Sequence, residues 1–228
     1  MIFRQFLAPD EQLSYLLADS VTKQAALVDA HVSLEQQYRK AIDQLGLELR
    51  FLLETHVHET HVSLAPVFRR ELGARLVAHE FARMDCVDQR VRDGDTLFVG
   101  EEIIDIIATP GHSGCSISFL SHSRVLTGHS LLCGATGNCR RSDADPVQLN
   151  RSIHERLFLL PDETLVFPGH CGGQRRVSCI IDEKLHNREI GKEISQERFI
   201  QMKKEGQNNQ TAESGPFLRM NRQCGRTH

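Results

Sequence analysis

The chain has 228 residues, 40% of them hydrophobic, and a formal net charge of −3 with acidic and basic residues interspersed. This length and composition predict one globular domain with a full core, and the lack of a basic field argues against a nucleic-acid partner. No apolar run approaches the roughly 18 residues that span a bilayer, and the N-terminus lacks the layout of a signal peptide. We therefore expect a cytoplasmic protein without membrane contact.

The seven cysteines are odd in number, scattered along the chain and without a CxxC pair. This pattern does not resemble a disulfide framework. We expect reduced thiols, most of them acting as small buried hydrophobic residues.

The first part of the chain alternates short apolar runs with turns. These runs predict strands over residues 3–6, 13–18, 25–29 and 47–53. Apolar residues at helical spacing predict a helix over residues 34–45, with Ser33 as its N-cap and Gly46 as its stop.

The strand over residues 47–53 leads into the segment 55–61, which contains His56, His58 and His61. Neutral imidazole is the commonest protein metal ligand. Because α/β proteins place their sites at strand ends, this cluster predicts a metal centre.

Three later strands, over residues 103–108, 124–127 and 164–167, are followed by His112, His129 and His170. Further strands are expected over residues 75–78, 96–99 and 116–120, and helices over residues 63–72, 146–160, 176–187 and 195–204. Polar residues dominate after Glu205, so we expect a domain over 1–190, a C-terminal helix within 191–204 and a disordered tail over 205–228.

Four histidine-containing motifs follow one another along the chain: HxHxxH at 56–61, TPGH at 109–112, TGH at 127–129 and PGH at 168–170. Their order and spacing resemble the metallo-β-lactamase superfamily over about residues 1–190. The segments 1–5, 152–158 and 160–170 are similar to its persulfide dioxygenase branch, the ETHE1-like proteins. The resemblance implies an α/β fold, an αββα sandwich of two mixed β-sheets flanked by helices, and suggests a homodimer.

In the family a single iron is held by the first histidine of HxHxDH, the histidine of TPGH and the aspartate of TGD. The resemblance therefore implies His56, His112 and His129 as metal ligands, although the third is an aspartate in the family. His58, His61 and His170 are implied as additional ligands or supporting residues. Thr60 stands where the family has a second aspartate, and a neutral imidazole cannot bridge two metals, so we expect one metal ion, Fe(II), with Zn(II) as the alternative.

Two further segments depart from the family pattern. CGATGN at 133–138 replaces CGRTDF, and PGHCGG at 168–173 replaces PGHDYKG. Arg140 and Arg141 are candidates for contacting an anionic thiol substrate, and Cys171 is a candidate ligand or thiol nucleophile. Glu59 is a candidate general base beside the metal, but it occupies the variable position of its motif and is expected to be exposed.

The resemblance implies a mononuclear metal-dependent oxidoreductase that oxidises glutathione persulfide, or a similar low-molecular-weight persulfide, with O2 to sulfite. One alternative is a zinc-dependent thioester hydrolase of the glyoxalase II type that uses a three-histidine zinc hydroxide. Another is a catalytically silent relative that binds a thiol ligand or a partner protein.

Overall fold

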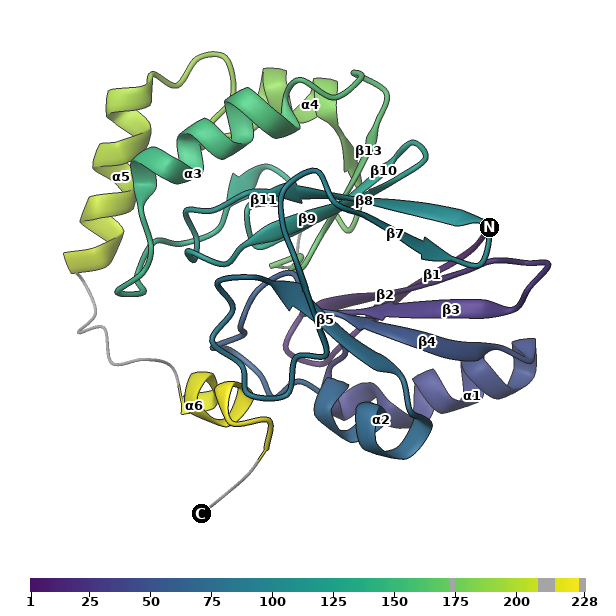
Figure 1. Cartoon of the computed structure of the whole chain (residues 1–228). Coiled ribbons are helices and arrows are strands. Elements are labelled where there is room, and N and C mark those ends of the chain that lie inside the picture. The colour runs from purple at the N-terminus through teal and green to yellow at the C-terminus, as the bar shows by residue number, and fades with distance from the viewer. Residues whose placement is uncertain (173–174, 209–215, 226–228) are drawn as a thin grey trace.

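Two six-stranded mixed sheets pack face to face and carry helices on their outer faces (Figure 1). The computed structural model describes residues 1–172, 175–208 and 216–225. The first sheet consists of β1 (Ile2–Leu7), β2 (Leu13–Ala18), β3 (Gln24–Val28), β4 (Glu48–Leu53), β5 (Arg75–His79) and β6 (Gln89–Val91). The second consists of β7 (Thr96–Val99), β8 (Glu102–Ala108), β9 (Ile117–Ser121), β10 (Arg124–Gly128), β13 (Leu165–Pro168) and β14 (Ser178–Cys179). The predicted αββα sandwich is confirmed.

In the first sheet, strands β3 to β6 run parallel, and their register sets what lies at the carboxyl end. Val28 of β3 pairs with Leu53 of β4, and Leu53 pairs with Val77 of β5. The next residues along β3 and β4 are Asp29 and Glu54, so two carboxylates meet at this edge. The histidine-rich loop begins there as well.

In the second sheet, β8 and β10 are both antiparallel to β9, while β10 and β13 are parallel. The strands β8, β10 and β13 therefore run in one direction and end at one edge of the sheet. His112, His129 and His170 follow these three strands. The topology brings both sets of strand-end histidines to the same side of the sandwich.

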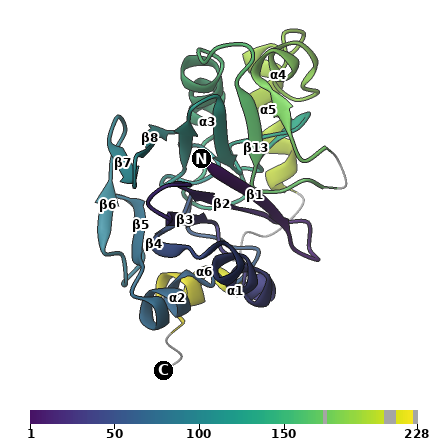
Figure 2. The ribbon, with the colours of Figure 1, turned by 90° about the vertical axis from the view of Figure 1, so that its right-hand side faces the viewer.

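Helices cover the outer faces of the two sheets (Figures 1 and 2). They are α1 (Glu35–Leu45), α2 (Ala65–Leu72), α3 (Pro146–Ser152), α4 (Ile180–His186), α5 (Gln196–Asn208) and α6 (Pro216–Arg222). Helices α1, α2 and α6 lie on the side of the first sheet, and α3, α4 and α5 on the side of the second. Of the helices in the described ranges, none combines the length and apolar character that crossing a membrane requires.

Local structure departs from the expectations at several places, among them β6, which no expected strand covered. A 3-10 turn, η1 (Val32–Leu34), precedes α1, and its cap is His31, whose side chain accepts a hydrogen bond from the Ser33 amide, so Ser33 is not the N-cap. Helix α3 runs into a π-helical turn, η2 (Ile153–Leu157). Short hydrogen-bonded pairs also form β14 and a hairpin of β11 (Leu131–Leu132) and β12 (Ala135–Thr136), which are too short to leave a periodic signal.

The C-terminal region differs from the expected disordered tail. Helix α5 continues to Asn208, and α6 packs on the molecule with Leu218 and Asn221 only 5% and 2% exposed. Buried contacts of these residues stabilise a segment whose polar composition predicted disorder. Residues 209–215 and 226–228 of the expected tail lie outside the described residues.

A disulfide joins Cys86 to Cys224, so the expectation of reduced thiols does not hold for this pair. The two residues are 138 positions apart in the sequence, and their Cα atoms lie 6.1 Å apart. Helix α6 brings them together, since the Asp85 amide donates to the Arg222 carbonyl at 2.9 Å. No spacing rule could have indicated a pair that depends on this docking. The other five cysteines are reduced thiols.

Candidate metal centre

His56 is oriented by the end of the neighbouring strand. The Asp29 carboxylate accepts hydrogen bonds from the Thr55 amide and from Thr55 Oγ1, both at 2.8 Å. Because the hydroxyl proton is given to Asp29, Thr55 Oγ1 accepts from His56 Nδ1 at 2.9 Å. This hydrogen bond leaves the lone pair on His56 Nε2.

Glycine at position 128 allows the loop after β10 to approach this arrangement. Gly128 has a φ of +51°, and a Cβ atom there would lie 2.5 Å from Thr55 Oγ1. Any side chain would displace Thr55 and therefore His56. The glycine of the TGH motif thus serves the packing between the two sheets.

His112 and His129 present their rings from the second sheet. His112 Nδ1 donates to the Asn138 carbonyl at 2.8 Å, and its Nε2 is buried without a hydrogen-bond partner. His129 Nε2 lies 3.0 Å from Gln12 Oε1. Because that amide oxygen only accepts, His129 carries its proton on Nε2 and its lone pair on Nδ1.

The three implied ligands converge. His56, His112 and His129 each offer one ligand atom, and these atoms all lie within 4.8 Å of one another. Nitrogen ligands lie about 2.1 Å from zinc, so two of them are roughly 3.4 Å apart in a tetrahedral site. The spacing, the burial of all three rings and the unpartnered His112 Nε2 fit a metal ion, with small adjustments of the rings.

The three rings are neutral at ordinary pH. Burial, followed by the charges of neighbouring histidines, holds the pKa of His56 and His129 well below its usual range. Burial also lowers the pKa of His112, although the nearby Glu59 carboxylate opposes that shift. Metal ligation requires the neutral imidazole, and the fold supplies it.

His58 belongs to a different cluster. Its Nε2 lies 2.7 Å from Glu54 Oε2 and 3.3 Å from Asp29 Oδ1. Burial alone would lower the pKa of His58, but these carboxylates outweigh it and raise the pKa to about 10. Asp29, Glu54 and His58 form a second group with ligand atoms within 4.8 Å, here held together by a protonated histidine.

His61 and His170 lie outside the three-histidine set. The His61 ring stacks on His31 at a centroid distance of 4.6 Å, and burial holds its pKa well below the usual range. The His170 ring is 6.2 Å from that of His129. Thr60 is exposed, and its hydroxyl lies 3.5 Å from His61 Nδ1.

Glu59 was expected to be exposed from its variable position in the motif, and the structure corrects this. Its side chain is 13% exposed, and Oε1 lies 3.9 Å from His112 Nε2. Arg141 NH1 donates to Glu59 Oε2 at 2.8 Å and to the Val57 carbonyl at 2.6 Å. The sequence signal for a role of Glu59 was its position between His58 and His61, in the same loop.

The remaining candidate residues are dispersed. Arg141 is only 6% exposed and reaches the centre through Glu59, whereas Arg140 is exposed and its amide donates to Asn138 Oδ1. Cys171 is 8% exposed and belongs to the hydrophobic core between the sheets, outside both ligand groups found in the described part of the chain. The structure therefore places Arg141, and neither of the other two, beside the three histidines.

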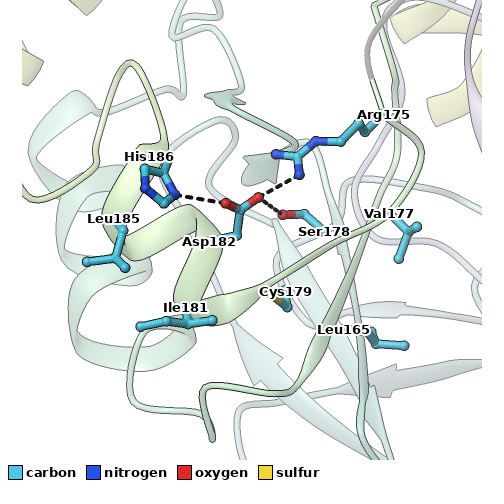
Figure 3. A pocket seen from close by; sticks show the side chains of 9 residues that line it. All are labelled: Leu165, Arg175, Val177, Ser178, Cys179, Ile181, Asp182, Leu185 and His186. Carbon is cyan, nitrogen blue, oxygen red and sulfur yellow. Dashed lines mark hydrogen bonds and ion pairs between the residues drawn. The ribbon is translucent and has the colours of Figure 1, made fainter.

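Two cavities help to define the surroundings. One of about 750 Å³ is lined by Val57, Gly114, Arg141 and Asp143 together with residues of the 80–83 segment, and adjoins the Glu59–Arg141 pair. Another, of about 530 Å³, lies between β14 and α4, where Asp182 accepts from Arg175, Ser178 and His186 (Figure 3). None of the three clustered histidines lines this second cavity.

Comparison with known proteins agrees with this geometry. The family model of the metallo-β-lactamase superfamily matches residues 7–170. The chain belongs to the metallo-β-lactamase superfamily. Members of this superfamily bind metal ions, as the expected centre requires.

Two kinds of enzyme are among the relatives. Mitochondrial persulfide dioxygenase ETHE1 from Bos taurus and from Homo sapiens is 28% identical over 206 residues, which cover 89% of this chain and 80% of the relative. A hydroxyacylglutathione hydrolase from Polaromonas is 32% identical over 164 residues, covering 69% of this chain and 61% of the relative. The crystal structure of ETHE1 from Myxococcus xanthus superposes with a TM-score of 0.93 and 34% identity, covering 99% of this chain and 100% of that one. These superfamily relatives support an enzyme.

Proposed function

We propose that this protein is a mononuclear metal-dependent oxidoreductase that oxidises glutathione persulfide, or a similar low-molecular-weight persulfide, with O2 to sulfite. The observation that carries the proposal is the buried set of three neutral histidines, His56, His112 and His129. The similarity to ETHE1 proteins over nearly the whole chain supports the choice of reaction.

A single ion is favoured over two. His61 and His170 are not in the three-histidine set, and Thr60 and His129 supply no carboxylate to bridge a second metal. His56, His112 and His129 would hold Fe(II), with Zn(II) as the alternative. When bound, Fe(II) with open coordination positions supplies the O2 chemistry that side chains lack.

The chain's own residues provide binding and proton transfer. The Arg141 guanidinium, fixed by Val57, Glu59 and Asp143, attracts an anionic persulfide toward the histidines. Glu59 Oε1, beside His112, accepts a proton from the persulfide or water that enters. The overall reaction is RSSH + O2 + H2O → RSH + SO3²⁻ + 2H⁺, in which the persulfide loses four electrons to O2.

The test is O2 consumption by the Fe(II)-loaded protein with glutathione persulfide, measured together with sulfite release. We expect one sulfite per O2, and loss of both signals after removal of iron with a chelator. Metal analysis of protein purified without added metal gives a second measure. A metal-replete protein that consumes no O2 with persulfide would contradict the proposal.

A zinc-dependent thioester hydrolase of the glyoxalase II type is the second candidate. It is favoured by the similarity to hydroxyacylglutathione hydrolase, and three neutral histidines leave a zinc ion with its full charge to activate water. Hydrolysis of S-lactoylglutathione under anaerobic conditions would support it over the oxidoreductase. Neither activity in metal-replete protein would indicate a catalytically silent relative.

A further inference from the structure

One side chain from the C-terminal helix forms hydrogen bonds with the backbone of the loop that carries the motif histidines. Asn221 Nδ2 donates to the carbonyls of His58 and His61, at 2.9 and 2.8 Å. Its Oδ1 accepts from the Ser63 amide at 2.9 Å. At 2% exposure, Asn221 shields these groups from water that would otherwise bind them.

This contact matters to the loop because residues 54–62 form neither helix nor strand, and the carbonyls of His58 and His61 pair with a side chain rather than with a neighbouring strand. A buried carbonyl without a hydrogen bond destabilises the folded state, and Asn221 pairs two of them. Ser63 also donates through its hydroxyl to Glu54, which in turn binds His58. Asn221 is therefore connected to both ends of the loop in which His56 lies.

Helix α6 has seven residues, and a helix of that length is marginal in water without tertiary contacts. Leu218 packs in the core cluster beneath the first sheet, and the Arg222 carbonyl binds the Asp85 amide. The covalent link is the Cys86–Cys224 disulfide, three residues beyond Asn221. Cys224 is 4% exposed, whereas Cys86 is only partly buried, so an incoming thiol approaches the disulfide from the Cys86 side.

We propose that Asn221 is a positioning residue for the metal-ligand loop and that the Cys86–Cys224 disulfide is a redox tether that keeps it in place. A low-molecular-weight thiolate attacks the Cys86 sulfur, the S–S bond breaks, and Cys224 leaves as a thiolate that takes up a proton. A second thiol then frees Cys86 and forms the thiol's own disulfide, so two thiols supply the two electrons. Reduction releases α6 and loosens the loop, and this inference rests on the proposed metal centre.

The first arm of the test compares Asn221→Ala with Arg219→Ala, a matched control on the same helix whose side chain is exposed. Affinity for Co(II) is measured by competition with a chromogenic chelator, together with the visible spectrum of the bound ion. We expect Asn221→Ala to weaken binding by about 10-fold or more and to change the spectrum, since supporting residues of metal sites have effects of this size. Arg219→Ala should stay within about twofold of wild type.

The second arm uses the wild-type protein treated with glutathione, so it does not depend on whether Asn221→Ala folds. Thiol titration after denaturation and removal of glutathione should rise from five cysteine thiols to seven. Co(II) affinity should fall to that of a Cys86→Ser, Cys224→Ser double variant, which itself should not respond to glutathione. Wild-type affinity and spectrum in Asn221→Ala and in reduced protein would overturn the proposal.

Hydrogen exchange of the amides over residues 58–64 in metal-free protein separates this inference from the proposed function. Faster exchange in Asn221→Ala and after reduction supports the positioning role of Asn221 and the tether even if no metal binds. Unchanged exchange overturns the proposal. Failure of wild-type protein to bind Co(II) would instead overturn the metal centre.

Discussion

His56 and His58 lie two residues apart in one buried loop, yet the structure gives them opposite protonation states. His56 joins His112 and His129, and burial among other imidazoles keeps it neutral. His58 turns to Asp29 and Glu54, whose charges overcome the same burial and keep it protonated. The difference shows that nearby carboxylates, rather than position in the motif, decide the protonation state of each histidine.

The largest expected effect comes from breaking the neutral cluster. His56→Ala removes one of three ligand nitrogens, so metal affinity should fall by about 1,000-fold, or roughly 4 kcal/mol. Competition with a chelator measures this change. His154→Ala, outside both clusters, serves as the control and should bind metal like wild type; an unchanged affinity in His56→Ala would remove that residue from the ligand set.

Breaking the charged cluster should instead affect folding. Glu54→Gln leaves the buried His58 with one carboxylate partner, and we expect the free energy of unfolding to fall by about 3 kcal/mol. Chemical denaturation measures it, with Glu48→Gln on the exposed side of β4 as the control. A loss equal to that of the control would show that the pair contributes nothing to stability.

The same cluster predicts a pH dependence. The pKa of His58 is raised to about 10 in the folded protein, above its unfolded value of about 6.5. Its contribution to stability is therefore fully present below about pH 6.5 and is lost as pH rises toward 10. Denaturation of the metal-free protein from pH 6 to 10 should show this decline, and Glu54→Gln should flatten it. An equally steep decline in the variant would point to another group.

Replacing His129 by aspartate restores the residue that the family carries there and tests whether three histidines are the working form. We expect His129→Asp to retain metal but to lose about tenfold in dioxygenase rate, or roughly 1.4 kcal/mol, because the hydrogen bond from His129 Nε2 to Gln12 is lost. Steady-state kinetics of the purified variant measure the change in rate, and metal analysis measures the retained metal. A strong gain in activity would show that the native protein has drifted from this role.

The smallest expected effect concerns Arg141. Arg141→Lys keeps the charge but loses the planar group that contacts Val57, Glu59 and Asp143 together. We expect KM for the persulfide to rise about fivefold, or roughly 1 kcal/mol, with kcat little changed. Arg140→Lys is the adjacent control, and equal effects at both positions would argue against a specific role for Arg141.

Most of the strands could be predicted because apolar runs and turns are local signals. Errors occurred where the local signal was weak, as for Ser33, which lies inside a 3-10 turn capped by His31, and for β14, which is two residues long. Glu59 was misjudged because its burial depends on Arg141, 82 residues away.

The sequence by itself determined the superfamily, and the resemblance of its motifs to that family implied the three histidines that come together, His56, His112 and His129. Tertiary structure decided the rest. The protonation of His58 depends on Asp29 and Glu54 meeting through the register of β3 and β4. Asn221 donates to the His61 carbonyl, 160 residues away in the sequence, and Cys224 forms a disulfide with Cys86, 138 residues away. Such contacts arise from packing of distant segments, which no short sequence pattern encodes.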